Sequence, residues 1–207
     1  MLPLTTELAP GATVGMWQDF VSSNPESASE TDWGKTVTKF YGGRLKSRYL
    51  DPIKTLQSGP GVGEGFAIVA IQCSLIEFLE SCYQGINYKY CPPGQQPGPN
   101  EYKVSLLIFR SFLSGRAPMK RDFTPALADA FYRGIRCGVL HEARTNGTWL
   151  VHNKSSSGQC VDATVPILYR DDLQYAIERF IDDYCSAVPG NLVLKQAFIR
   201  KFNHLCL

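Results

Sequence analysis

The sequence predicts an all-α protein, a helical bundle of about five or six helices that carries one small β-hairpin. Three observations support this fold class. Apolar residues recur at helical spacing in several long segments, and β-branched and aromatic residues gather around only one serine-rich turn. The chain of 207 residues is 44% hydrophobic and 19% charged, which is typical of a globular protein with a buried core.

The first part of the chain shows little periodicity. Residues 1–30 are rich in Pro, Gly, Ser and Thr and are expected to form an irregular arm. Residues 31–57 are expected to form one or two short helices with basic faces. We therefore expect an N-terminal extension over residues 1–61, followed by one helical domain over residues 62–207.

Residues 64–84 form the clearest predicted helix. Its apolar residues cover most of the helix surface, which indicates a central helix packed on more than one side. The narrow polar stripe carries Glu77 and Glu80. The simpler interpretation is that these carboxylates line a solvated edge, and the alternative is that they pair with a cation near a site.

The sequence of the middle of the chain predicts a loop followed by two helices. Residues 91–100 read CPPGQQPGPN, and this proline content excludes both a helix and an inner strand. Residues 103–114 are short and apolar, and we favour a helix there over a buried strand. Thr124 can cap a second strong helix over residues 125–145, with Pro125 in its first turn.

The last third predicts a hairpin and two helices. Residues 148–152 and 160–168 flank the turn SSSG and are expected to pair. Residues 170–188 return to helical spacing, and Gly190 ends that helix. A final helix is expected over residues 191–204.

Composition limits the class of function. A formal net charge of +2 gives no strong long-range field, so any polyanion must bind locally. The start of the chain lacks the features of a secretory signal, and the apolar runs are interrupted, so we expect a cytoplasmic protein without a membrane partner. The seven cysteines include no C-x-x-C pair and are expected to be reduced core thiols, with no bound metal.

The helix over residues 125–145 gathers cations on one face. A helical wheel places Arg133, Arg144, Cys137 and His141 opposite the apolar face, with Arg136 at the edge. Guanidinium groups bind phosphate oxygens through two donors, and an imidazole can relay protons near neutral pH. Such a group of side chains can cleave a phosphodiester, although an exposed basic face is more often only a solvated surface.

Gly134 and Gly138 lie on the same helix, four residues apart. Each costs about 1 kcal/mol of helix stability relative to alanine, so a close approach of another backbone is expected there. That backbone belongs either to the same chain or to a helix of a second subunit.

The segment FYRGIRCGVLHEART resembles the R-x(4–6)-H signature of HEPN domains, through Arg136 and His141. The apolar helix GFAIVAIQCSLIEFLESCYQG and the last helical segments are also similar to that family, so the likeness covers roughly residues 62–204. The resemblance implies an all-α, metal-independent ribonuclease without cofactors, which forms homodimers and acts in toxin–antitoxin or phage-defence systems, in the former beside an antitoxin partner. It implies that Arg136 binds phosphate and that His141 is the catalytic histidine.

One residue departs from the family's pattern. Many HEPN proteins carry Asn, Asp or His directly after the motif arginine, whereas this chain has Cys137. Arg136 and His141 are five residues apart and therefore about 140 degrees apart on a regular helix. That angle favours a composite site built by two subunits, and a distorted helix is the competing explanation.

The leading hypothesis is an endoribonuclease in which Arg136 and His141 carry the chemistry. Backbone contacts to RNA are expected from five cations, namely Arg133, Arg144, Lys195, Arg200 and Lys201. Glu77, Glu142 and Cys137 are expected to support the site. The alternative is a non-catalytic module that dimerises and binds RNA, a nucleotide or a protein partner.

Overall fold

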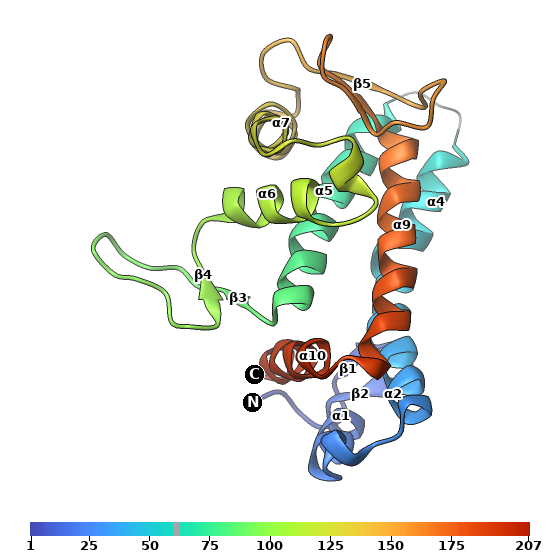
Figure 1. Cartoon of the computed structure of the whole chain (residues 1–207), viewed down its shortest axis with the longest axis vertical. Coiled ribbons are helices and arrows are strands. Elements are labelled where there is room, and N and C mark those ends of the chain that lie inside the picture. Colours follow the sequence, from blue (N-terminus) through green and yellow to red (C-terminus); the bar gives the residue numbers. More distant parts are fainter. Residues whose placement is uncertain (60–62) are drawn as a thin grey trace. The chain divides into compact units, whose positions relative to one another are not determined.

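The computed structural model describes residues 1–59 and 63–207 and is mostly helical (Figure 1). The chain divides into two compact units. The terminal unit consists of residues 1–51, 81–103 and 182–207, and the central unit consists of residues 52–80 and 104–181. The helical class expected from the sequence is therefore confirmed.

The terminal unit is built from both ends of the chain and one internal segment. Its first strands and helices lie close to the final helix near the two chain ends (Figure 1). Its elements are β1 (Glu7–Ala9), β2 (Ala12–Thr13), α1 (Val14–Ser22), η1 (Pro25–Ser27), α2 (Glu30–Val37), η2 (Thr38–Gly42), α3 (Gly43–Leu45), η3 (Lys46–Leu50), β3 (Asn87–Tyr88), β4 (Glu101–Tyr102), η6 (Val188–Gly190) and α10 (Leu192–Leu205).

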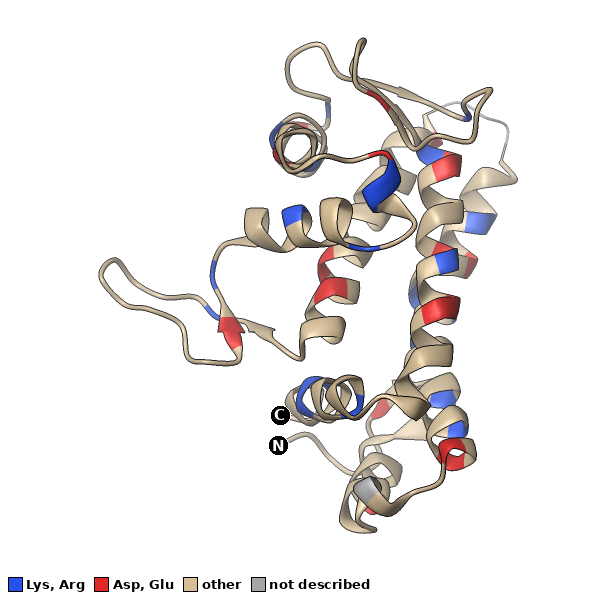
Figure 2. Cartoon of the chain, in the orientation of Figure 1, with Lys and Arg blue, Asp and Glu red and all other residues tan. Residues whose placement is uncertain are grey.

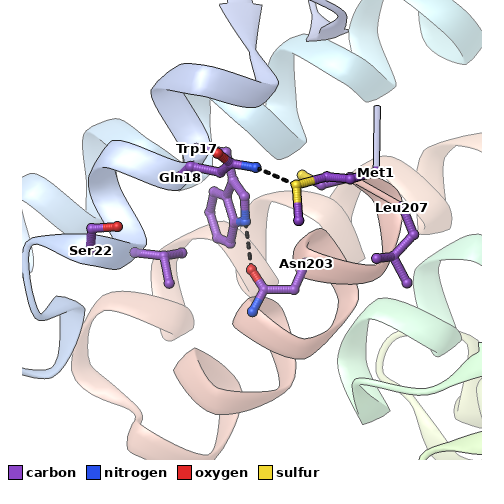
Figure 3. Close-up of a pocket in the computed structure, with 8 residues that line it drawn as sticks. Met1, Trp17, Gln18, Ser22, Asn203 and Leu207 are labelled. Atoms are coloured by element: carbon purple, nitrogen blue, oxygen red, sulfur yellow. Dashed lines mark hydrogen bonds between the residues drawn. The ribbon is translucent and has the colours of Figure 1, made fainter. Parts of the chain in front are cut away.

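An aromatic cluster holds the terminal unit together. Trp17 of α1 is buried, and its ring packs against Phe40 and against Phe198 and Phe202 of α10. Its indole Nε1 donates a hydrogen bond to Asn203 Oδ1 at 2.8 Å (Figure 3). The expectation of an irregular arm over residues 1–30 is wrong, because this aromatic burial orders the segment.

Residues 30–57 form an almost continuous helical run. Ser29 caps α2 by accepting a hydrogen bond from the Asp32 amide. Two π-helical turns, η2 and η3, interrupt the run before α4 (Asp51–Gln57). The predicted short helices are present, and the π turns are the feature that helical spacing did not indicate.

The central unit packs α6 and α7 beside α5, with a small sheet before α9. Two carboxylate–arginine pairs tie these helices together: Arg116 to Glu80 of α5, and Arg110 of α6 to Asp129 of α7. The unit's elements after α4 are α5 (Glu64–Gln84), α6 (Ser105–Gly115), η4 (Met119–Arg121), α7 (Pro125–Phe131), η5 (Tyr132–Arg136), α8 (Cys137–Glu142), β5 (Leu150–His152), β6 (Val161–Asp162), β7 (Ile167–Tyr169) and α9 (Arg170–Ala187), of which the ends of α5 and α9 belong to the terminal unit.

Helix α5 confirms the predicted central helix, although its polar edge is not solvated. Glu80 is fully buried and accepts hydrogen bonds from Ser111 and from both Nε and Nη2 of Arg116 at 2.6–2.9 Å. The simpler interpretation of Glu80 is therefore wrong. A carboxylate can be buried in an apolar helix because a bidentate guanidinium compensates its charge.

Helix α5 is also long and apolar enough to span a membrane, judged by length and composition alone. Many of its apolar side chains are buried within the protein, as expected for a core helix: Ile68, Val69, Cys73, Leu75, Ile76, Leu79 and Cys82.

The predicted hairpin is only partly correct. The segment contains a three-stranded sheet in the order β5-β7-β6, in which β5 pairs with β7 in parallel and β6 pairs with β7 antiparallel. The first strand therefore pairs in parallel with the third, and a hairpin turn cannot join two parallel strands.

The expected division into an extension and one helical domain does not match the two units. Residues 1–51 pack with the last helix rather than standing apart. The expected boundary at residues 61 and 62 lies outside the described residues.

Replacing Glu80 tests the buried pair. Glu80→Gln removes the charge opposite the Arg116 guanidinium and should lower the free energy of unfolding by about 2 kcal/mol, measured by urea denaturation. Glu142→Gln, on an exposed glutamate, should change it by less than about 0.5 kcal/mol. Equal stability of the two variants would contradict the role given to Glu80.

Candidate active site

The two motif residues lie on the helical segment formed by α7, η5 and α8. Thr124 caps α7 through a hydrogen bond from the Leu127 amide, as the sequence predicted. At η5 the helix widens into a π turn, where the Cys137 amide donates to the Tyr132 carbonyl. The segment ends where Ala143 adopts a left-handed conformation with φ of 53°.

Arg136 and His141 of the same chain are in contact. Arg136 Nη1 lies 3.4 Å from His141 Nε2. Since a guanidinium can only donate, the imidazole nitrogen in this contact is the acceptor. The long arginine side chain spans the gap between the two positions on the helix. A second subunit is therefore not required to bring the two side chains together, and this contact corrects the argument from the helical angle.

Glu77 of α5 holds the guanidinium from the other side. Its Oε2 is 3.6 Å from Arg136 Nη2, and both side chains are about one-fifth exposed, at 20% and 19%. The Ser105 hydroxyl, at the start of α6, donates to Glu77 Oε1 at 2.6 Å. The structure therefore supports the alternative interpretation, in which Glu77 pairs with a cation near the site.

Arg136 differs from Arg110, Arg116 and Arg121 of the central unit, whereas Arg170 shares its pattern, with a 3.6 Å ion pair to Asp171 and a buried Nε that has no hydrogen-bond partner among the described residues. Arg110, Arg116 and Arg121 each form a two-point hydrogen-bonded pair with one carboxylate, with every distance at or below 2.9 Å. Arg136 has instead a 3.6 Å ion pair with Glu77 and the 3.4 Å contact with His141, and its buried Nε has no hydrogen-bond partner among the described residues. Neither contact is a short two-point pair, so the protein holds the Arg136 guanidinium less tightly than those of Arg110, Arg116 and Arg121.

The surroundings of Arg136 carry little charge besides Glu77. The guanidinium carbon lies 5.3 Å from the centre of the Tyr132 ring. Burial raises the pKa of Tyr132 and raises the pKa of Cys73 to about 12, in each case against the opposing effect of the Arg136 charge. Both groups therefore stay protonated at neutral pH, and Glu77 is the anion that balances Arg136.

The two helix glycines receive the chain's own return loop. A Cβ at Gly134 would lie 2.1 Å from the Trp149 ring, and a Cβ at Gly138 would lie 2.5 Å from the Arg144 carbonyl oxygen. The Asn146 amide also donates to the Gly134 carbonyl at 2.8 Å. The suggestion that a helix of a second subunit crosses at this glycine pair is therefore wrong.

The other predicted residues on this segment are at the surface or at its edge. Arg133, Arg144 and Glu142 are exposed, and Cys137 is half-buried beside Arg136 in the sequence. The Arg133 and Arg144 side chains are therefore accessible to solvent, and no described contact joins either of them to Arg136 or His141. Glu142 has no described contact with the pair, so its supporting role remains a prediction.

The three predicted cations of α10 belong to the terminal unit and have structural contacts. Lys195 lies over the Trp33 ring at 5.4 Å, and Arg200 donates to the carbonyls of Gln84 and Gly85. Lys201 is only 6% exposed and donates to the Ile86 carbonyl and to Asn87 Oδ1. The buried position of Lys201 contradicts its predicted contact with RNA.

Ser105 and Tyr132 contact the site residues Glu77 and Arg136 but were not predicted from the sequence. Tyr132 is four residues before Arg136, a spacing that places both on one side of the segment. That spacing could have revealed the tyrosine. Ser105 had no such signal, because its contact with Glu77 depends on how α6 packs against α5.

Two hollows lie elsewhere. An apolar hollow of about 370 Å³ in the terminal unit is lined by residues that include Met1, Trp17 and Leu207 (Figure 3). A polar hollow of about 560 Å³ in the central unit is lined by residues that include Arg121 and Asp172. Neither is lined by Arg136 or His141. Within residues 1–59 and 63–207, no three or more His, Cys, Asp or Glu side chains are grouped to hold a metal ion.

Replacing Gly134 tests the packing of the return loop. Gly134→Ala should lower the free energy of unfolding by about 2 kcal/mol, because the new methyl group overlaps the Trp149 ring. Gly34→Ala is the matched control, since that helical glycine has open space around its Cβ position, and it should raise stability by roughly 0.5 kcal/mol. Thermal unfolding of both variants measures the difference, and an unharmed Gly134→Ala protein would refute the assigned packing.

In comparisons with known proteins, no family model, no curated protein and no solved structure matches this chain.

Proposed function

We propose that this chain is a HEPN-type endoribonuclease that cleaves single-stranded or loop RNA without a metal ion. The observation that carries the proposal is the contact of 3.4 Å between Arg136 Nη1 and His141 Nε2, with Arg136 steadied by Glu77. The resemblance of the R-x4-H segment supplies the reaction class. The exposed imidazole of His141 and the guanidinium of Arg136, whose side chain is 19% exposed, supply the reacting groups.

In the proposed reaction, His141 Nε2 accepts the proton of a ribose 2′-hydroxyl, and the resulting oxygen attacks the adjacent phosphorus. Arg136 donates to the non-bridging oxygens, whose negative charge grows in the pentacoordinate transition state. The bond to the 5′-oxygen then breaks, and that oxygen takes a proton from water or from the imidazolium of a second copy. The products are a 2′,3′-cyclic phosphate and a 5′-hydroxyl.

Arg133 and Arg144 are proposed to hold the RNA backbone beside the reacting phosphate. Both side chains are exposed and lie on the segment that carries the pair. Their contribution would weaken as salt concentration rises, because each phosphate contact releases bound counterions.

The proposal retains a cytoplasmic homodimer, restrained by an antitoxin or acting in phage defence, as the family resemblance implies. Exposed apolar side chains next to the cluster support association, namely Leu140 of α8, with Val104 and Leu107 at the start of α6. Each subunit of such a dimer would carry its own Arg136–His141 pair.

A non-catalytic module that binds RNA, a nucleotide or a protein partner is the second candidate. Cys137 favours it, since a thiol replaces the polar residue common after the motif arginine. The same cluster of Arg136, His141 and Glu77 would then bind a phosphate without cleaving it.

Cleavage of RNA in EDTA tests the main proposal. Purified wild-type protein should cut total RNA and leave cyclic phosphate ends, and His141→Ala should lower the rate at least 100-fold, because the proton relay is lost. His152→Ala is the matched control, as that histidine is also exposed but lies on β5, and it should cut normally.

Two outcomes would change the assignment. Undiminished cutting by His141→Ala would remove the proposed chemistry. Absence of cutting by the wild type, together with RNA binding, would favour the non-catalytic module.

Mixing inactive subunits tests whether the pair works within one chain. Arg136→Ala and His141→Ala proteins should each be inactive, and a refolded mixture should remain inactive, because no chain in it retains both groups. The rate of RNA cleavage measures this outcome. Recovery of activity on mixing would show instead that the site is composite, with Arg136 and His141 taken from different subunits.

A further inference from the structure

The β3–β4 segment of the terminal unit exposes aromatic rings. Tyr88 and Tyr90 are 55% and 72% exposed, which is unusual for two large rings separated by one residue. In the sequence they alternate with lysine, as NYKY, and the same pairing recurs as EYK before α6. In an extended chain, residues two apart face the same side.

The backbone that carries these rings is ordered by pairing. The strands β3 and β4 run in parallel, with Tyr88 opposite Tyr102. The Tyr88 and Tyr102 ring centres are 5.8 Å apart and the rings meet at 70°. The Lys89 amide also donates to the Tyr102 carbonyl at 2.8 Å, so the Tyr88 ring is held in place while more than half of it faces water.

Two lysines and one carboxylate belong to the same segment as the rings: Lys89, Lys103, whose Nζ donates to the Gln95 carbonyl at 2.7 Å, and Glu101 of β4. Helix α10 carries lysine, arginine and histidine but no aspartate or glutamate, and Figure 2 shows basic positions along it and on the chain around β3 and β4. Arg200 and Lys201 bond to the backbone that leads into β3. Lys89 is exposed, with its ammonium 3.8 Å from the Glu101 carboxylate, and exposed His204 interacts electrostatically with both.

We propose that Tyr88 and Tyr90, with Lys89 and Lys103, form a binding surface for single-stranded nucleic acid. Bases would stack on the two tyrosine rings, and the cations would contact the phosphates. Stacking requires bases that are not paired, so the surface selects single strands over duplexes. The surface lies in the terminal unit and does not rest on the ribonuclease proposal.

Fluorescence anisotropy with a labelled oligoribonucleotide of about 12 residues tests the proposal, since such surfaces bind roughly 4–16 nucleotides. The His141→Ala protein is used throughout, so that cleavage cannot affect the reading. Tyr88→Ala with Tyr90→Ala should weaken binding at least about 10-fold. The double Tyr→Phe variant should bind like the parent, because it keeps both rings.

Two further variants separate stacking from charge and from unfolding. Lys89→Ala should reduce the slope of log affinity against log salt by about one. Tyr175→Ala is the matched control, as Tyr175 is 64% exposed on α9, and it should bind normally.

Equal affinity of the Tyr→Ala and Tyr→Phe variants would overturn the proposal. So would duplex RNA that binds as tightly as the single strand, or a parent protein that binds neither single-stranded RNA nor single-stranded DNA.

Discussion

The central unit depends on two carboxylates that project from a mostly apolar helix. Glu77 and Glu80 are three residues apart on α5, so they lie on one side of it. Glu80 binds Ser111 and Arg116 and thereby fixes α6, while Glu77 binds Ser105 and faces Arg136. A buried carboxylate such as Glu80 would cost several kcal/mol without such partners, and Glu77 links the start of α6 to the motif arginine.

The local shape of the motif helix follows from its π turn and from the loop that packs against it. The π turn at η5 interrupts the regular helix and ends at Arg136, and π turns of this kind are frequent at functional positions. Gly134 and Gly138 then let the return loop lie directly on the helix, where Trp149 covers one side. His141 stays exposed, whereas the Arg136 side chain packs toward Glu77 of α5 and is 19% exposed.

Sequence reasoning found the elements whose signal is local. The helices around residues 64–84, 105–115 and 170–205 repeat apolar side chains at helical spacing because one face of each is buried. The order of residues 1–30 was missed, since Trp17 finds its partners at Phe198 and Phe202, at the opposite end of the chain.

The candidate site was also predictable only where its signal is local. The motif indicated Arg136 and His141, but a helical wheel counts Cα directions and ignores the reach of a guanidinium, so their contact in one chain was not expected. Ser105 and the strand order β5-β7-β6 depend on long-range packing and left no local trace.

The division into units also has a consequence for biosynthesis. On the ribosome, the partners that build the central unit have all emerged by residue 181, whereas residues 1–51 must wait for the last helix before their aromatic rings are covered. Nascent chains would therefore expose Trp17 and Trp33 for most of translation, which makes the N-terminal segment the natural target of chaperones.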